Sequence, residues 1–143
     1  DIFRTFTPAS VYQIYSNSDL EVAKSVKNLT PKNSVFVTAS NHNHPIPTLT
    51  GRSTYIGFNG WVWSHGIDFS QRANEVALIY LGGPTAEELI TKNRINYVAV
   101  GPVENSSYAI NHLYFSRFPT INIYTDWVIY DVSSLWANSY RQN

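Results

Sequence analysis

Apolar residues recur in two patterns along the chain, and the two patterns alternate. Within 18–29, Val22, Val26 and Leu29 are spaced i, i+4, i+7, which is typical of a helix with one apolar side. The β-branched run 35–39 follows and predicts a buried strand. Alternation of helical and strand patterns is typical of an α/β domain.

The first predicted helix, 18–29, has signals at both ends. Ser18 and Glu21 have the spacing of a capping box, which predicts Ser18 as the N-cap. Thr30-Pro31 predicts the end, because proline disfavours helical backbone in the residue before it. Residues 1–17 show no clear period, and we expect them to form an extended lead-in.

Two further helices and a strand are predicted in the middle of the chain. The first helix covers 70–80, with Ser70 as its N-cap, and Gly82-Gly83 ends it. The second begins at Pro84, since proline suits the first helical turn. The apolar positions of the two helices are Ala73, Val76, Ala77 and Tyr80, then Ala86, Leu89 and Ile90. A strand over 95–100 follows.

The remaining patterns complete the predicted sheet. A short strand is expected over 53–57 and a short helix near 108–115. Two apolar runs, 121–124 and 127–132, flank Thr125-Asp126 and predict a C-terminal β-hairpin.

These elements predict one α/β domain over 18–132, followed by a C-terminal tail, 133–143. The fold expected is a small Rossmann-like sheet, mainly parallel, with flanking helices and the C-terminal hairpin. Crossover connections make the first three strands parallel. Ligands of such open sheets bind beyond the carboxyl ends of the strands. The polar loop 40–47 and the Gly- and Trp-rich loop 58–69 follow the first two strands, so both should lie at that end.

Composition narrows the classes of function. The formal net charge is zero and the chain has no basic run, which argues against a nucleic-acid partner. Ten Tyr, seven Phe and four Trp exceed what a small core needs, so some rings should face a ligand, a partner or a membrane boundary. Cysteine is absent, which excludes thiolate metal sites and fits an extracytoplasmic setting. The chain begins at Asp1 without methionine, and we expect it to be a fragment of a larger protein.

The histidines of the first loop are candidates for substrate contact or metal binding. His42 and His44 are two residues apart, which puts both side chains on one side of an extended segment. His65 and Asp68 of the next loop would complete a set of ligands that suits zinc. The alternative is that these loop histidines hydrogen-bond to the backbone. The chain lacks a His-x-x-x-His helix, which favours this structural role, or a substrate contact, over metal binding.

Trp61 and Trp63 show the same spacing in the second loop. With Tyr55, Phe58 and Phe69 nearby in the sequence, they predict a stacking platform for sugar rings or for polyprenyl and other lipid-linked substrates. The alternative is that the indoles fill the core beneath the loop.

Three further polar residues join the candidates. Arg52 follows Gly51 and is suited to hold a carboxylate or phosphate, although an arginine in such a turn is more often structural. Arg72 is spaced to pair with Asp68 at the start of a helix. The candidate substrate-binding residues are therefore Asn41, His42, His44, Arg52, Trp61, Trp63, His65, Asp68 and Arg72.

Several of these motifs together resemble a known family. The segments are TPKNSVFVT (30–38), HNHP (42–45), LTGR (49–52) and GWVWSHGID (60–68). They look like the C-terminal extracytoplasmic soluble domain of multi-pass GT-C-type membrane glycosyltransferases, which use lipid-linked sugar donors. The helix and strand of 86–100 also resemble the usual ending of that domain, and the resemblance covers about residues 19–132.

A more distant similarity is to the soluble domain of the oligosaccharyltransferase catalytic subunit. In that subunit a Trp-Trp-Asp-Tyr-Gly motif follows the first strand and helps to hold the acceptor. Here Asn41-His42-Asn43-His44 stands at the corresponding place. We therefore do not infer from this similarity that the chain recognises an acceptor peptide.

The resemblance implies a domain on the extracytoplasmic face of a membrane that contributes substrate or acceptor contacts and is not catalytic alone. Its implied partners are the transmembrane part of the same polypeptide and a lipid-linked sugar or glycan acceptor. No cofactor is expected in this fragment, although a divalent metal is compatible with the parent protein. Two alternatives stay open: a metal-dependent hydrolase built on the His42, His44, His65 and Asp68 set, and a carbohydrate-binding or protein-interaction module. Asn28 and Asn105 begin N-glycosylation sequons.

Overall fold

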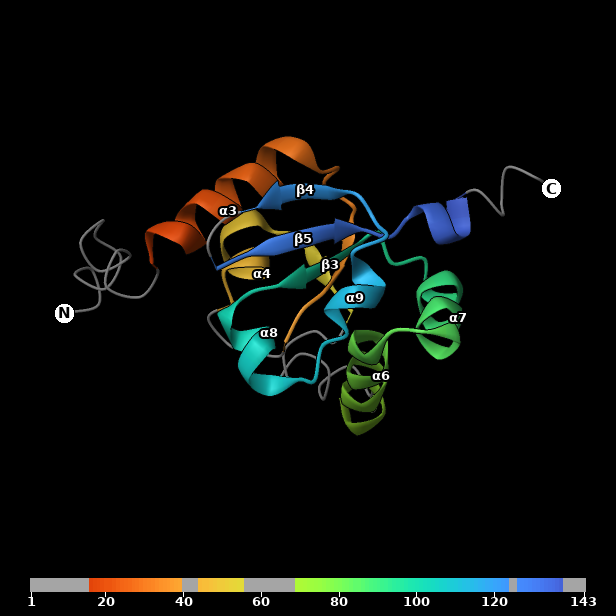
Figure 1. The fold of residues 1–143 in the computed structure, drawn as a ribbon. Coiled ribbons are helices and arrows are strands. Elements are labelled where there is room, and N and C mark those ends of the chain that lie inside the picture. Colours follow the sequence, from red (N-terminus) through yellow and green to blue (C-terminus); the bar gives the residue numbers. More distant parts are fainter. Residues whose placement is uncertain (1–15, 40–43, 56–68, 124–125, 138–143) are drawn as a thin grey trace.

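The computed structural model describes residues 16–39, 44–55, 69–123 and 126–137, and it is an α/β structure, as predicted (Figure 1). The strands are β1 (Val35–Val37), β2 (Ser53–Thr54), β3 (Tyr97–Val100), β4 (Thr120–Ile123) and β5 (Val128–Asp131). The helices are α3 (Asn17–Leu29), α4 (Pro45–Thr50), α6 (Phe69–Leu81), α7 (Pro84–Asn93), α8 (Pro102–Ser107) and α9 (His112–Phe115).

The strands form one mixed sheet in the order β2-β1-β3-β5-β4. β1 pairs in parallel with both β2 and β3, which confirms the predicted direction of the first three strands. β5 pairs antiparallel with β3, and β4 pairs antiparallel with β5. Residues 124–125 lie outside the described residues, so the hairpin remains a prediction, as does the Rossmann-like class.

Side chains of the strands alternate between two apolar cores, one on each face of the sheet. Phe36 and Val37 are neighbours in β1, and they belong to different cores. α3 and α4 cover the face of Phe36, whereas α6, α7 and α9 cover the face of Val37 (Figure 1). The two helical layers bury both faces of the sheet, which explains why the strands carry apolar residues at consecutive positions.

The start of α3 corrects one prediction. The N-cap is Ser16, whose Oγ accepts a hydrogen bond from the Asp19 backbone N–H at 3.1 Å, and Asp19 Oδ2 accepts one from the Ser16 N–H at 3.2 Å. The predicted capping box at Ser18 and Glu21 is therefore wrong. The sequence offers both spacings, and a tertiary hydrogen bond to Asp19 from a distant indole favours the earlier one.

The apolar stripe of α3 is only partly buried. Val22 and Val26 are buried, as predicted, but Leu29 is 60% exposed. The last turn of α3 is held by a polar contact instead, because Arg52 donates hydrogen bonds to the carbonyls of Lys27 and Thr30.

A second correction concerns 45–50, which forms α4 where a loop and a turn were predicted. His44 is the N-cap, Pro45 occupies the first helical position, and Gly51 is the C-cap with φ +73°. Proline at the start and glycine just after the end are signals of a helix. The segment was predicted as a loop because six residues are too few to show a helical period. α8 was missed for the same reason, although it also begins with a proline, Pro102.

The two middle helices lie close to their predicted bounds. α6 begins at Phe69, one residue before the predicted N-cap Ser70, and α7 begins at Pro84 as predicted. Gly82 and Gly83 separate the helices, and both have positive φ, +73° and +87°. A Cβ atom at Gly82 would lie 2.6 Å from the Tyr114 ring, whereas nothing lies within 4 Å of one at Gly83.

The residues after β5 remain attached to the domain. Residues 134–137 form a helical turn, and Trp136 Nε1 donates a hydrogen bond to the Ile95 carbonyl at 2.8 Å. Ile95 precedes β3, so this contact lies at the amino end of the parallel strands. The predicted tail, 133–143, is described as far as residue 137.

The two glycines give a matched test of the packing between α6 and α9. Gly83→Ala should cost only backbone strain, about 1–3 kcal/mol, because Gly83 has φ +87° and ψ −169°, a conformation that is almost exclusive to glycine. Gly82→Ala should lower the free energy of unfolding by about 1–3 kcal/mol more, because it also overpacks the Tyr114 ring. Urea denaturation of both variants measures the difference. Equal losses would mean that Tyr114 does not pack against Gly82 in solution.

Candidate functional site

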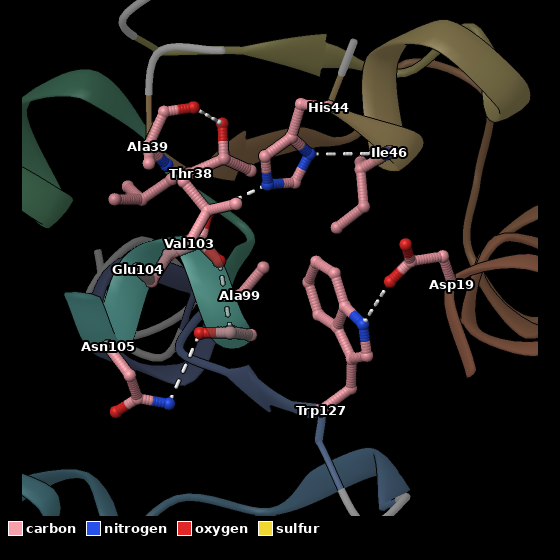
Figure 2. Close-up of polar contacts among 12 residues, drawn as sticks. Asp19, Thr38, Ala39, His44, Ile46, Ala99, Val103, Glu104, Asn105 and Trp127 are labelled. Atoms are coloured by element: carbon pink, nitrogen blue, oxygen red, sulfur yellow. Dashed lines mark hydrogen bonds and ion pairs between the residues drawn. The ribbon is translucent and has the colours of Figure 1, made fainter. Parts of the chain in front are cut away.

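The carboxyl ends of β1 and β3 form the place in this sheet where a ligand site is expected. β1 and β3 are neighbours, but the chain leaves β1 toward β2 on one side and leaves β3 toward β5 and β4 on the other. In open α/β sheets, ligands bind at the carboxyl ends of the strands where the chain direction reverses in this way. Two buried polar side chains, His44 and Glu104, meet there (Figure 2).

Glu104 is the centre of this cluster, which we call the Glu104 hub. It comprises Glu104 and its three hydrogen-bond donors, Ala39, His44 and Gly101. Glu104 Oε1 accepts from the Gly101 backbone N–H at 2.9 Å, and Oε2 accepts from the Ala39 N–H at 2.8 Å. His44 Nε2 lies 2.7 Å from the same Oε2. One carboxylate, with no exposed surface, therefore joins the ends of β1 and β3 to the start of α4 (Figure 2).

The hydrogen bonds of His44 fix its tautomer. His44 Nδ1 accepts from the Ile46 backbone N–H at 3.2 Å, so this nitrogen carries no proton. Nε2 must then be the protonated nitrogen, and it donates to Glu104. Both ring nitrogens are therefore engaged, and only 1% of the residue is exposed.

The environment of Glu104 favours its ionised form. Burial, the largest effect, would raise the pKa of this carboxyl group, but the hydrogen bond and the electrostatic attraction from His44, together with the hydrogen bond from the Ala39 backbone, outweigh it. The net effect is a pKa below the usual value of 4.5. Glu104 is consequently a carboxylate at neutral pH and not a general acid.

Trp127 extends the cluster toward α3. Its indole meets the His44 ring edge to face at 5.6 Å and donates from Nε1 to Asp19 Oδ1 at 2.9 Å (Figure 2). Gly101 lies against the same indole, and a Cβ atom there would be 2.7 Å from it. These contacts connect the start of α3 to the carboxyl ends of β1 and β3.

Arg52 is placed in a structural role. Its guanidinium is buried and donates to the carbonyls of Thr50, Lys27 and Thr30 at 2.9–3.1 Å, while its Nε–H donates to Thr30 Oγ1 at 3.1 Å. These bonds use four of the five N–H donors of the side chain. They tie the C-terminal ends of α3 and α4 together, which favours the structural alternative over a phosphate or carboxylate contact.

Arg72 contacts Tyr55 at the end of β2. Its guanidinium lies over the Tyr55 ring, 4.4 Å from the centroid, and donates to the Tyr55 carbonyl. The Tyr55 hydroxyl donates to Glu75 Oε1 at 2.5 Å. Burial, aided by Glu75, raises the pKa of Tyr55 to about 12, so the phenol stays protonated and cannot serve as a base near neutral pH.

The other predicted site residues lie outside the described residues. They are Asn41, His42, Trp61, Trp63, His65 and Asp68. Within the parts of the chain that the structure describes, no group of three or more His, Cys, Asp or Glu side chains is arranged to hold a metal ion. His44 would have to give up one of its two hydrogen bonds to bind a metal.

Glu104, the hydrogen-bond acceptor shared by the hub, was not among the site residues predicted from the sequence. Glu104 comes after Gly101-Pro102, which was interpreted only as the end of a strand. Proline followed two residues later by glutamate is also a pattern of a helix start, with Glu at the N3 position. That signal predicts a helix end beside the third strand, but it does not reveal that His44 lies opposite.

No protein-family model matches the chain, and neither does any curated protein. None of the helices in the described ranges is long and apolar enough to cross a membrane.

The ionisation of Glu104 should appear in the pH dependence of stability. A carboxyl whose pKa is lowered on folding stabilises the fold above its unfolded pKa, and this contribution is lost as pH falls through the folded value. The unfolding free energy of the wild type should therefore approach that of Glu104→Gln as the pH falls below about 4.5. Urea titrations from neutral to acidic pH test this. Glu88→Gln, at an exposed site on α7, is the control and should stay parallel to the wild type.

Proposed function

We propose that this chain is an extracytoplasmic soluble domain of a membrane-embedded, glycosyltransferase-like protein, where it contributes substrate or acceptor contacts and is not catalytic alone. The proposal that the domain is not catalytic alone rests on one observation: the polar groups of the Glu104 hub already have hydrogen-bond partners. A His–Glu pair that acts as a general base needs a free ring nitrogen directed at the substrate. In His44 one nitrogen donates to Glu104 and the other accepts from Ile46.

The location of two sequence segments supports substrate contact. Asn41 and His42 lie in the chain between Ala39 and His44, which are both bound to Glu104. Segment 56–68, which carries Trp61 and Trp63, begins directly after Tyr55 at the end of β2. β1 and β2 are parallel, so the described residues before the two segments, Ala39 and Tyr55, follow strand ends at the same edge of the sheet. Polar and aromatic residues together suit a sugar ring, which presents hydroxyls at its edge and C–H groups on its faces.

The membrane context rests on the resemblance of the sequence motifs to GT-C-type proteins. Under this proposal the transmembrane part of the same polypeptide supplies the catalytic acids and any divalent metal. This domain then positions a lipid-linked sugar or a glycan acceptor on the extracytoplasmic face.

Binding of a short-chain polyprenyl-phosphate sugar, measured by tryptophan fluorescence alongside a panel of soluble glycans, tests the proposal. We expect the Trp61→Leu/Trp63→Leu variant to bind about fivefold to 150-fold more weakly, since two stacked rings together contribute about 1–3 kcal/mol. Trp136→Leu is the control, because Trp136 is bound near the amino end of β3, and it should retain wild-type affinity. The proposal fails if the wild type binds none of these probes. Binding of soluble glycans alone would favour a carbohydrate-binding module.

Metal analysis separates this proposal from the hydrolase hypothesis. Stoichiometric zinc or manganese in the purified chain, lost in a His42→Ala/His44→Ala double variant, would support a metal-dependent hydrolase. Our proposal expects the double variant and the wild type to have the same metal content.

A further inference from the structure

Four large apolar side chains are exposed among the described residues, and three of them lie on two adjoining helices. Leu78 is 42% exposed, and Leu81, about one turn later in α6, is 50% exposed. Leu113, in α9, is 85% exposed. We call these three residues the leucine patch. The fourth, Leu29, belongs to α3, which covers the other face of the sheet (Figure 1).

The two helices that carry the leucine patch meet at the end of α6. Asn111, the N-cap of α9, donates from Nδ2 to the Leu81 carbonyl at 3.3 Å. Gly82 comes directly after Leu81, and a Cβ atom there would lie 2.6 Å from the ring of Tyr114, the residue after Leu113. Leu81 and Leu113 are thus each next in sequence to a residue of this contact, so the exposed leucines of α6 and α9 lie close together (Figure 1).

Backbone carbonyls beside the leucine patch are hydrogen-bonded within the domain. The end of a helix usually leaves its last carbonyls to water. Here the Leu81 carbonyl accepts from Asn111, and the Ile79 carbonyl accepts from the Gly82 N–H at 3.0 Å. The Ser116 hydroxyl donates to the Leu113 carbonyl at 2.6 Å. An apolar medium could cover these carbonyls at little cost, because burial is expensive for polar groups that have no partner.

The segments that carry the leucine patch contain basic but no acidic residues. Residues 76–83 of α6 and the following turn carry no charge, and 105–118 contain His112 and Arg117 without any Asp or Glu. Arg117 is exposed, and its guanidinium lies over the Tyr114 ring, 4.5 Å from the centroid. Stacking uses the face of a guanidinium and leaves its N–H donors at the edge, where they can bind a phosphate group.

One acidic residue of α7 lies near this arginine. Of Glu87 and Glu88, it is Glu87 whose charge acts on Tyr114. Burial is the largest effect on the Tyr114 hydroxyl, and together with Glu87 it raises the pKa of that group to about 12, while Arg117 opposes the shift. Glu87 is half-buried, whereas Arg117 is exposed, so a partner at the leucine patch meets the cation first.

A lipid surface fits the leucine patch better than a second copy of the chain does. A stable dimer interface buries about 800 Å² on each partner, which takes about 20–30 residues. Three leucines at the ends of two helices supply much less. A two-fold axis through the patch would also bring Arg117 and its copy into one interface. A bilayer surface requires no matching shape, and it presents apolar chains together with anionic headgroups.

We propose that the leucine patch, with Arg117 beside it, docks this domain on the surface of a lipid bilayer that contains anionic headgroups. The inference rests on the proposed function, because a domain joined to a transmembrane part is held close to the bilayer. Such a tether raises the effective concentration of the lipid surface. A patch too small to bind tightly by itself is then sufficient to orient the domain.

The experiment measures binding of the purified chain to lipid vesicles that contain no sugar lipid. One set is phosphatidylcholine alone, and the other also contains phosphatidylglycerol. Co-sedimentation is followed up to roughly millimolar lipid, because a small apolar surface binds weakly without a tether. Leu81→Gln/Leu113→Gln removes the two most exposed side chains of the leucine patch, and Leu113→Gln alone replaces it if the double variant fails to fold. Leu29→Gln is the matched control, since Leu29 is 60% exposed on the other side of the domain.

We expect the wild type to bind the vesicles that contain phosphatidylglycerol. The double variant should bind them at least about tenfold more weakly, because two apolar side chains no longer enter the bilayer surface. Arg117→Gln should weaken binding to these vesicles about fivefold and leave binding to phosphatidylcholine unchanged, since it removes one contact with anionic headgroups. Leu29→Gln should bind like the wild type. Circular dichroism checks that each variant is folded.

Three results would overturn this inference. The first is a wild type that does not bind the vesicles, and the second is an equal loss of binding in Leu29→Gln and in the double variant. The third is a wild-type dimer, detected by analytical ultracentrifugation, that the double variant loses, because the leucines would then contact a second copy.

The polyprenyl-phosphate sugar separates this inference from the proposed function. If the chain binds that sugar but not the vesicles, the docking role is wrong while the proposed function stands. If the chain binds the vesicles through the leucine patch but does not bind the sugar or the soluble glycans, the docking role stands and the proposed substrate contacts fail.

Discussion

The arrangement of the chain at the carboxyl ends of β1 and β3 depends on one carboxylate and its three hydrogen-bond donors. Glu104 accepts from Ala39, His44 and Gly101, which come from three separate parts of the chain. Each of those donors would be buried without a partner if the carboxylate were removed, and a buried unpaired donor costs about 1–3 kcal/mol. Because the acceptor is shared, these segments cannot move independently. The shared carboxylate thus fixes the relative positions of Ala39, His44 and Gly101.

The two cores explain why the carboxylate can be held so tightly. The helices on the two faces bury the strands from both sides, so apolar packing as well as polar contacts holds the strands in place. Trp127 then links the core of α3 and α4 to the hub, because its ring packs beside His44 and its N–H reaches Asp19. Gly101 is required where the chain passes this indole. Apolar packing positions the strands, and the hydrogen bonds fix the backbone at the strand ends.

The sequence predicted the elements that have a period long enough to detect. Val22 and Val26 identified α3, and Gly82-Gly83 with Pro84 identified the boundary between α6 and α7. α4 and α8 were missed because six residues give no usable period. Of the candidate site residues, His44 was found as a polar loop histidine, but its partner is 60 residues away. Local patterns cannot reveal such a pair, since it forms only when β1 and β3 become neighbours.

Both ring nitrogens of His44 are hydrogen-bonded, and this changes the interpretation of His42 and His44 as a pair. Two histidines separated by one residue suggest a matched pair with one role. Here His44 is buried as a cap for α4 and a donor to Glu104, which leaves it no free nitrogen for metal or proton transfer. His42 lies outside the described residues, and it is the histidine to which a substrate role is proposed. The pair thus divides into one residue that fixes the backbone and one candidate for the ligand. This division is what a domain that positions a substrate for catalytic groups located elsewhere requires.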